Sequence, residues 1–106
     1  MAAKKANNNG AVEKATFFVN TALDLLNYEK DIWNGPMYSS AFDLLMIKGS
    51  CAYSISVDSA ISIFNNAIQQ SNNRLHLYEA CYYLIMAYLS QGKFEKVFEV
   101  LKNQNP

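Results

Sequence analysis

The segment from residue 78 to residue 101 constrains the fold of this chain most, because it has the pattern of two helices joined by a tight corner. Residues 78–89 are apolar on nearly every side of a helix. The segment that starts at Phe94 instead places apolar residues at positions i, i+3, i+4 and i+7. Gly92 lies between the two and supplies the backbone freedom that a sharp corner needs. The pattern predicts an antiparallel helical hairpin.

The rest of the chain shows helical periodicity and no alternating strand pattern, which predicts an all-α fold. We expect helices at about 11–33, 39–52, 56–70, 75–91 and 94–103. Pro36 should end the first helix, and Ser39 or Ser40 should cap the second. Residues 1–10 lack apolar periodicity and should form a flexible N-terminal arm, with 11–106 as a single domain.

Each expected helix has an apolar stripe that should face the core. The stripe of the first helix consists of Ala15, Phe18, Val19, Ala22, Leu25 and Leu26, widened by Phe17. The next two helices should turn inward Phe42, Leu45, Met46, Gly49, Val57, Ala60, Ile61, Phe64, Ala67 and Ile68. Stripes of this kind on successive helices predict one shared core.

Composition and charge argue against several classes of function. The formal net charge is zero, and the longest basic run is Lys4-Lys5, so no concentrated basic face for nucleic acid is expected. The single His76 has no acidic partner nearby and should face solvent or cap a helix. Cys51 and Cys81 belong to different hairpins and are expected to be reduced, buried thiols rather than metal ligands. We therefore expect no enzyme activity, no cofactor and no metal.

Helices 39–52 with 56–70, and 75–91 with 94–103, resemble two tetratricopeptide-type hairpins. The resemblance implies a five-helix tetratricopeptide-like bundle of antiparallel helical hairpins that forms a right-handed superhelix, with the first helix capping one end. Met46 and Ile85 occupy matching inward positions 39 residues apart, which exceeds the usual period of 34. The repeats are therefore degenerate.

A narrower resemblance comes from the order of short motifs along the chain. These are Asp24-Leu25-Leu26-Asn27-Tyr28-Glu29-Lys30, Ser39-Ser40-Ala41-Phe42, Met46-Ile47-Lys48, Ala60-Ile61, Tyr82-Tyr83-Leu84, Tyr88 and Phe94-Glu95-Lys96-Val97. In this order they resemble the cytosolic domain of the mitochondrial fission adaptor family (fission protein one). The resemblance implies a tail-anchored receptor that recruits a dynamin-related GTPase or its adaptor protein. The sequence departs from the family at Leu44, Ile85 and Val97, and this chain ends at Pro106, before the further helix and membrane anchor of the family.

The expected binding surface is a concave apolar groove between the second and fourth helices. Its residues would be Asp43, Ile47, Ser50, Tyr82, Met86 and Leu89. The last three lie on the helix face opposite Cys81, Leu84 and Tyr88, so they leave an apolar surface that needs a cover. A register shift of one residue would bring in Leu44 and Lys48 instead. We expect an apolar partner segment, either an amphipathic helix or an extended peptide.

Three alternatives for function remain open at this point. The first is a fission adaptor on the cytosolic face of the mitochondrial outer membrane or of peroxisomes, held there by a C-terminal anchor that is absent from this chain. Its N-terminal arm could fold over the groove. The second is a soluble tetratricopeptide-like chaperone that sequesters an amphipathic helix of a partner. The third is a structural subunit whose exposed flank forms a homodimer.

Overall fold

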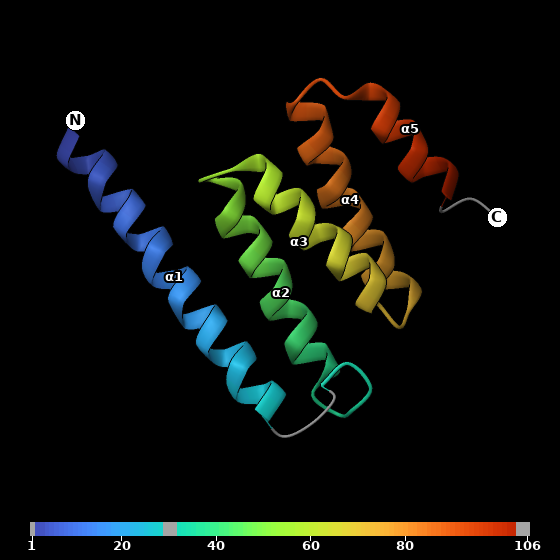
Figure 1. The fold of residues 1–106 in the computed structure, drawn as a ribbon, viewed down its shortest axis with the longest axis horizontal. Coiled ribbons are helices and arrows are strands. Elements are labelled where there is room, and N and C mark those ends of the chain that lie inside the picture. Colours follow the sequence, from blue (N-terminus) through green and yellow to red (C-terminus); the bar gives the residue numbers. More distant parts are fainter. Residues whose placement is uncertain (1, 29–31, 104–106) are drawn as a thin grey trace.

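Five helices form a single layer in the computed structural model, which describes residues 2–28 and 32–103, with side chains for 10–27 and 32–103 (Figure 1). Each helix packs against the next one along the chain, and α2 also contacts α4. The layer measures 49 × 40 × 16 Å, and no described residue lies in a strand. The helices are α1 (Ala2–Tyr28), α2 (Tyr38–Tyr53), α3 (Val57–Gln70), α4 (Arg74–Ser90) and α5 (Phe94–Asn103). The all-α prediction is confirmed.

Two helices begin at polar residues that cap them. The Ser56 hydroxyl accepts a hydrogen bond from the Ser59 backbone N–H at 3.4 Å, at the start of α3. The Asn73 side chain accepts one from the His76 backbone N–H at 2.8 Å, at the start of α4. These caps satisfy amides that have no partner inside the helix. The corner between α4 and α5 is made by Gly92, whose φ of 71° lies in the left-handed region that favours glycine.

The start of α2 differs from the prediction. Its first residue follows Met37, which makes no side-chain cap, and Ser39 and Ser40 lie exposed inside the first turn. The turn instead closes through the backbone, where the Tyr38 N–H donates to the Gly35 carbonyl at 3.2 Å. The expected serine cap is therefore wrong.

The core lies between α2, α3 and α4. Phe42, Phe64 and Leu84 are its largest fully buried side chains, one from each helix. Gly49 allows α2 and α3 to approach closely, because a Cβ at this position would overlap the ring of Phe64. The core cluster consists of Tyr38, Phe42, Leu45, Met46, Ala60, Phe64, Ala67, Ala80 and Leu84. The predicted inward stripe of α2 is confirmed, since Phe42, Leu45, Met46 and Gly49 are all buried.

Helix α1 differs from its prediction at both ends. It begins at Ala2 rather than near Ala11, so the expected arm of residues 1–10 is helical over 2–10, and its mobility stays a prediction. Alanine and lysine are strong helix formers, which a search for apolar periodicity does not register. The helix is described to Tyr28. Trp33, where the prediction ended it, lies in a turn and packs edge-to-face against Tyr38 at 6.4 Å.

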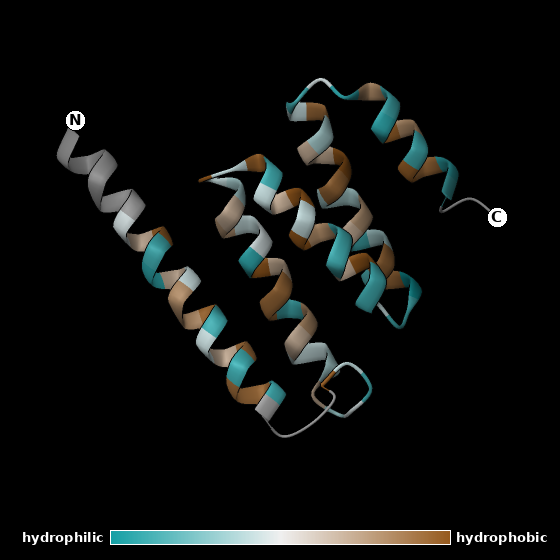
Figure 2. Ribbon diagram, in the orientation of Figure 1, coloured by the Kyte–Doolittle hydropathy of each residue, from teal (hydrophilic) through white to brown (hydrophobic). Residues whose placement is uncertain are grey.

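The predicted inward stripe of α1 is only partly covered. Val19 is buried and Ala15, Ala22 and Leu26 are half-buried, but Phe17, Phe18 and Leu25 are largely exposed. The reason is that α1 packs against α2 alone, so one narrow face is covered while the rest of a wide stripe faces solvent. Figure 2 shows hydrophobic residues along both α1 and α5, the two helices at the edges of the layer.

Candidate protein-binding groove

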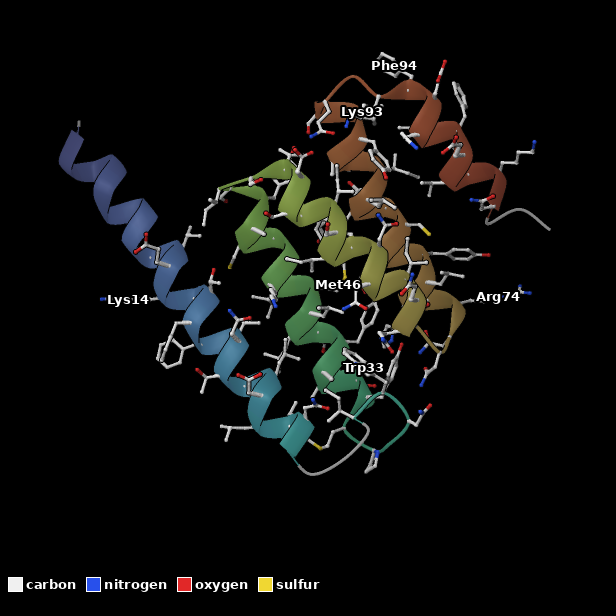
Figure 3. The ribbon with its side chains drawn as sticks, in the orientation of Figure 1. Lys14, Trp33, Met46, Arg74, Lys93 and Phe94 are labelled. Carbon is white, nitrogen blue, oxygen red and sulfur yellow. The ribbon has the colours of Figure 1, made fainter. Side chains whose placement is uncertain are left out.

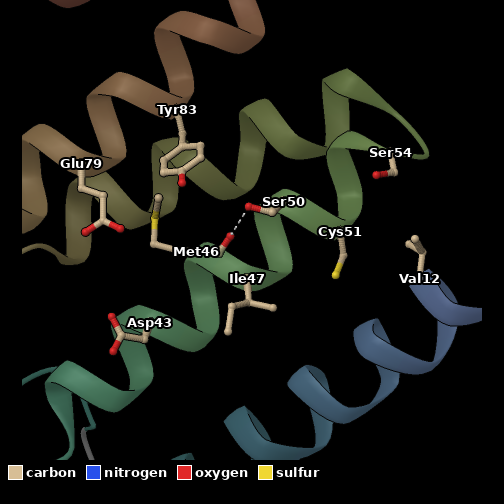
Figure 4. A pocket seen from close by; sticks show the side chains of 9 residues that line it. All are labelled: Val12, Asp43, Met46, Ile47, Ser50, Cys51, Ser54, Glu79 and Tyr83. Carbon is tan, nitrogen blue, oxygen red and sulfur yellow. Dashed lines mark hydrogen bonds between the residues drawn. The ribbon is translucent and has the colours of Figure 1, made fainter.

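Helices α1, α2 and α4 together line a hollow of about 570 Å³ on one face of the layer. Helix α2 supplies most of the lining, and Val12 of α1 lies opposite Ser54, the residue that directly follows α2 (Figure 4). We call this the first hollow. Its lining residues are Val12, Asp43, Met46, Ile47, Ser50, Cys51, Ser54, Glu79 and Tyr83.

A second hollow of about 300 Å³ adjoins the first. It is lined by Ser50, Tyr53, Phe64, Tyr82, Tyr83 and Met86. Ser50 and Tyr83 line both hollows, so the two form one continuous depression between α2 and α4, which we call the groove. Its walls are mainly aliphatic and aromatic, as is usual for sites that bind apolar ligands.

Packing and local hydrogen bonds fix the shape of the groove. The ring of Tyr83 stacks on Phe64 with centroids 5.5 Å apart, and Tyr82 meets Tyr83 edge-on at 5.5 Å. The Ser50 hydroxyl donates a hydrogen bond to the Met46 carbonyl within α2 at 3.1 Å (Figure 4). Its proton is therefore not available to a ligand in the groove. The aromatic wall is therefore anchored to the core through Phe64, which is fully buried.

The six predicted groove residues fall into three groups. Asp43, Ile47 and Ser50 line the first hollow, while Tyr82 and Met86 line the second. Leu89 lines neither. The side chains of Tyr82, Met86 and Leu89 are 59%, 45% and 41% exposed, so all three are accessible to a partner. The alternative pair, Leu44 and Lys48, is half-buried and lines neither hollow.

Sequence reasoning missed several residues of the groove. Glu79 and Tyr83 of α4 line the first hollow, and they share with Met86 the spacing i, i+4 and i+7 of a single helix face. That spacing could have identified them. Val12 carried no such signal, because its place depends on how α1 packs against α2.

The groove carries negative charge at one end. Asp43 of α2 and Glu79 of α4 lie at the same end of the first hollow (Figure 4). Neither carboxylate has a hydrogen-bond or ion-pair partner among the described residues. No lysine, arginine or histidine lines either hollow. A ligand with a basic residue at this end would therefore meet two unpaired carboxylates.

The two cysteines have different environments. Cys81 is buried in α4, and its burial raises the pKa of the thiol because the charged thiolate is poorly solvated there. Cys51 is half-buried and lines the first hollow. Neither forms a disulfide in this structure, and only Cys81 is buried as predicted. That the thiols are reduced stays a prediction.

His76 does not face solvent as expected, but joins α4 to α2. Its ring is half-buried and stacks on Phe42 with centroids 4.2 Å apart and planes 8° apart. Its Nδ1 atom lies 2.9 Å from the Tyr38 hydroxyl, which also accepts a hydrogen bond from the Asn72 backbone N–H at 2.9 Å. The capping function at this position belongs to the Asn73 side chain. We interpret His76 as a structural residue.

Among residues 10–27 and 32–103, no group of three or more His, Cys, Asp or Glu side chains is arranged to hold a metal ion. Within the described part of the chain, every helix is too short or too polar to cross a bilayer.

Comparison with known proteins identifies no relative. No family model, no curated protein and no solved structure matches this chain. The resemblance to the fission adaptor family therefore stays a prediction.

Proposed function

We propose that this chain is a protein-binding adaptor module that holds an apolar segment of a partner protein in the groove between α2 and α4. The observation that carries the proposal is the row of accessible apolar side chains on α4 beside a hollowed surface of α2. Apolar surface that lines a depression and remains open to solvent is typical of interaction sites. The aliphatic and aromatic side chains in its lining favour binding by apolar contact.

The groove also suggests the chemistry of the partner segment. Ile47, Tyr82 and Met86 would receive apolar side chains, each contributing roughly 25 cal/mol for every Å² of apolar surface removed from water. A lysine or arginine at one end of the segment would lie near Asp43 and Glu79. An amphipathic helix with a basic residue beyond its apolar face meets both conditions.

The resemblance to fission adaptors leads us to propose a specific partner. On this proposal the hairpins α2/α3 and α4/α5 are tetratricopeptide-like units of a right-handed superhelix, and the partner is a dynamin-related GTPase or its adaptor protein. The site of action would be the cytosolic face of the mitochondrial outer membrane or of peroxisomes. Recruitment to a membrane raises the local concentration of the GTPase and so favours its assembly.

The test is a pair of substitutions in the groove. Tyr82→Ala together with Met86→Asp should lower affinity for the dynamin-related GTPase or adaptor of the same organism by at least about tenfold, because both side chains line the second hollow. Binding is measured by calorimetry, and helical content by circular dichroism should not change. The matched control is Phe18→Ala with Leu25→Asp, which makes similar changes at exposed residues of α1 outside the groove. Unchanged binding by the groove variant would contradict the groove assignment.

A further inference from the structure

Helix α5 ends the layer and leaves most of its apolar face uncovered. It packs against α4 and no other described helix, mainly through buried Val97 and half-buried Val100. Phe94, Phe98 and Leu101 are 60%, 68% and 51% exposed. Figure 3 shows the labelled Phe94 projecting away from the other helices. An amphipathic helix with this much exposed aromatic surface needs a second surface to cover it.

The exposed residues form one stripe with charges placed along its edge. Phe94, Phe98 and Leu101 have the spacing i, i+4 and i+7, so they follow one helix face over about 10 Å. Glu95 and Lys102 are seven residues apart and therefore flank the same side of this stripe, with a negative charge near one end and a positive charge near the other. We call these five residues the α5 face.

The two flanking charges are unpaired within the chain. The salt bridge of α5 joins Lys96 to Glu99 at 3.5 Å, on a side of the helix away from the stripe. Neither Glu95 nor Lys102 has an ion-pair or hydrogen-bond partner among the described residues. Both are therefore available to a second molecule.

We infer that the α5 face pairs with the α5 face of a second copy of this chain, in an antiparallel arrangement about a two-fold axis near Phe98. In this arrangement Phe94 of each copy lies against Leu101 of the other, and Glu95 of each copy faces Lys102 of the other. A parallel pairing would instead place the charged flanks of the two copies on opposite sides of the seam, so Glu95 and Lys102 would stay unpaired. Charge complementarity therefore selects the antiparallel, self-complementary pair.

The antiparallel pair also continues the packing pattern of the layer. Successive helices run in alternating directions, and a second α5 that packs antiparallel keeps this alternation (Figure 1). Terminal units of helical arrays normally need such a cover. The stripe is short, and the buried area falls below the roughly 1,200–2,000 Å² of stable complexes, so the dimer should be weak, with a Kd on the order of 10–100 μM.

The corresponding face of α1 is less suited to self-pairing. Phe18 and Leu25 are exposed there, but Lys14 lies one turn before Phe18 and Thr21 lies one turn after it, on the same side of the helix. Figure 3 shows Lys14 projecting outward from α1, away from α2. In an antiparallel pairing, Lys14 of one copy would lie against Leu25 of the other, and Phe18 against Thr21, so charged and polar side chains would face apolar ones. Phe18 is therefore a matched control for Phe98.

Sedimentation velocity from about 5 to about 500 μM tests the inference. The unaltered chain should shift from monomer to dimer across this range, Phe98→Asp should remain monomeric, and Phe18→Asp should dimerise like the unaltered chain. Glu95→Lys and Lys102→Glu should each raise the dimer Kd by about threefold or more, while both together should restore it to within about twofold, since the swapped charges face each other again.

Three results would overturn the inference. The first is a monomer at every concentration, which would leave the α5 face to a different protein or to another segment of a longer chain. The second is equal dissociation by Phe18→Asp, which would indicate head-to-tail contact between α1 and α5. The third is failure of the double charge swap to restore the dimer. Partner binding in the groove should not change in Phe98→Asp, so failure of this inference and failure of the proposed function are distinguishable.

Discussion

The central helices α2–α4 and the edge helices α1 and α5 differ in how many neighbours cover them. Phe42, Phe64 and Leu84 of the central helices are fully buried, because α3 lies between α2 and α4 and those two also touch each other. Each edge helix contacts one neighbour, and its large apolar residues such as Phe18 and Phe98 stay exposed. Apolar stripes of similar sequence thus form a buried core in the central helices and an exposed apolar surface on the edge helices.

This difference in coverage suggests that the central helices determine the stability of the fold, whereas the exposed faces determine its association with other molecules. Burial in the central helices should supply most of the free energy of folding, since the hydrophobic contribution is proportional to the apolar area removed from water. The groove and the α5 face retain apolar area that only another molecule can cover. Variants in the centre should therefore change the free energy of unfolding, and variants on the exposed faces should change binding.

The largest expected effect on stability is Phe42→Ala. Removing this fully buried ring should lower the free energy of unfolding by about 3–5 kcal/mol, from lost burial and the cavity that remains. Phe18→Ala, the same change on exposed α1, should alter it by no more than about 0.5 kcal/mol. Urea denaturation followed by circular dichroism measures both. Equal effects would show that α1 is as well packed as the centre, contrary to its exposed side chains.

A smaller effect is expected from adding one methyl group at each of two glycines. Gly49→Ala should destabilise the fold by about 1–3 kcal/mol, because the new Cβ would overlap the Phe64 ring between α2 and α3. Gly10→Ala in α1 should stabilise it by about 0.5–1 kcal/mol, since the new methyl group would meet no atom within 4 Å beyond its chain neighbours and its own helix backbone, and alanine favours a helix. Thermal unfolding should show shifts of opposite sign. Destabilisation by Gly10→Ala would contradict the open placement of α1.

The helices whose ends were predicted best are those with a capping residue or a turn glycine at the boundary. Ser56, Asn73 and Gly92 mark ends that lie within a residue or two of the predicted ones, because capping and left-handed turns depend on local residues. Helix α1 was predicted less well. Alanine and lysine at positions 2–6 favour its helical start, although residues 7–10 are weak helix formers. Its covered face is decided by contact with α2, which periodicity alone does not specify.

The groove was predicted more completely on α2 than on α4. On α2, the predicted residues Asp43, Ile47 and Ser50 all line the groove. On α4, Glu79 and Tyr83 line it although they were not predicted, and the predicted Leu89 does not. The rotation of α4 depends on contacts between helices, such as the stacking of Tyr83 on Phe64 and of His76 on Phe42. These contacts join residues far apart in the sequence, so the pattern of one helix could not reveal them.

The most direct test of the central claim is a hydrogen-exchange footprint of the bound partner. With the dynamin-related GTPase or adaptor in excess, amide exchange should slow in residues 43–53 of α2 and 79–86 of α4, which carry the groove. It should not change along the outer face of α1 around Phe18. Slowed exchange confined to α1 or α5, with none in α2 and α4, would contradict the proposal that the groove is the binding site.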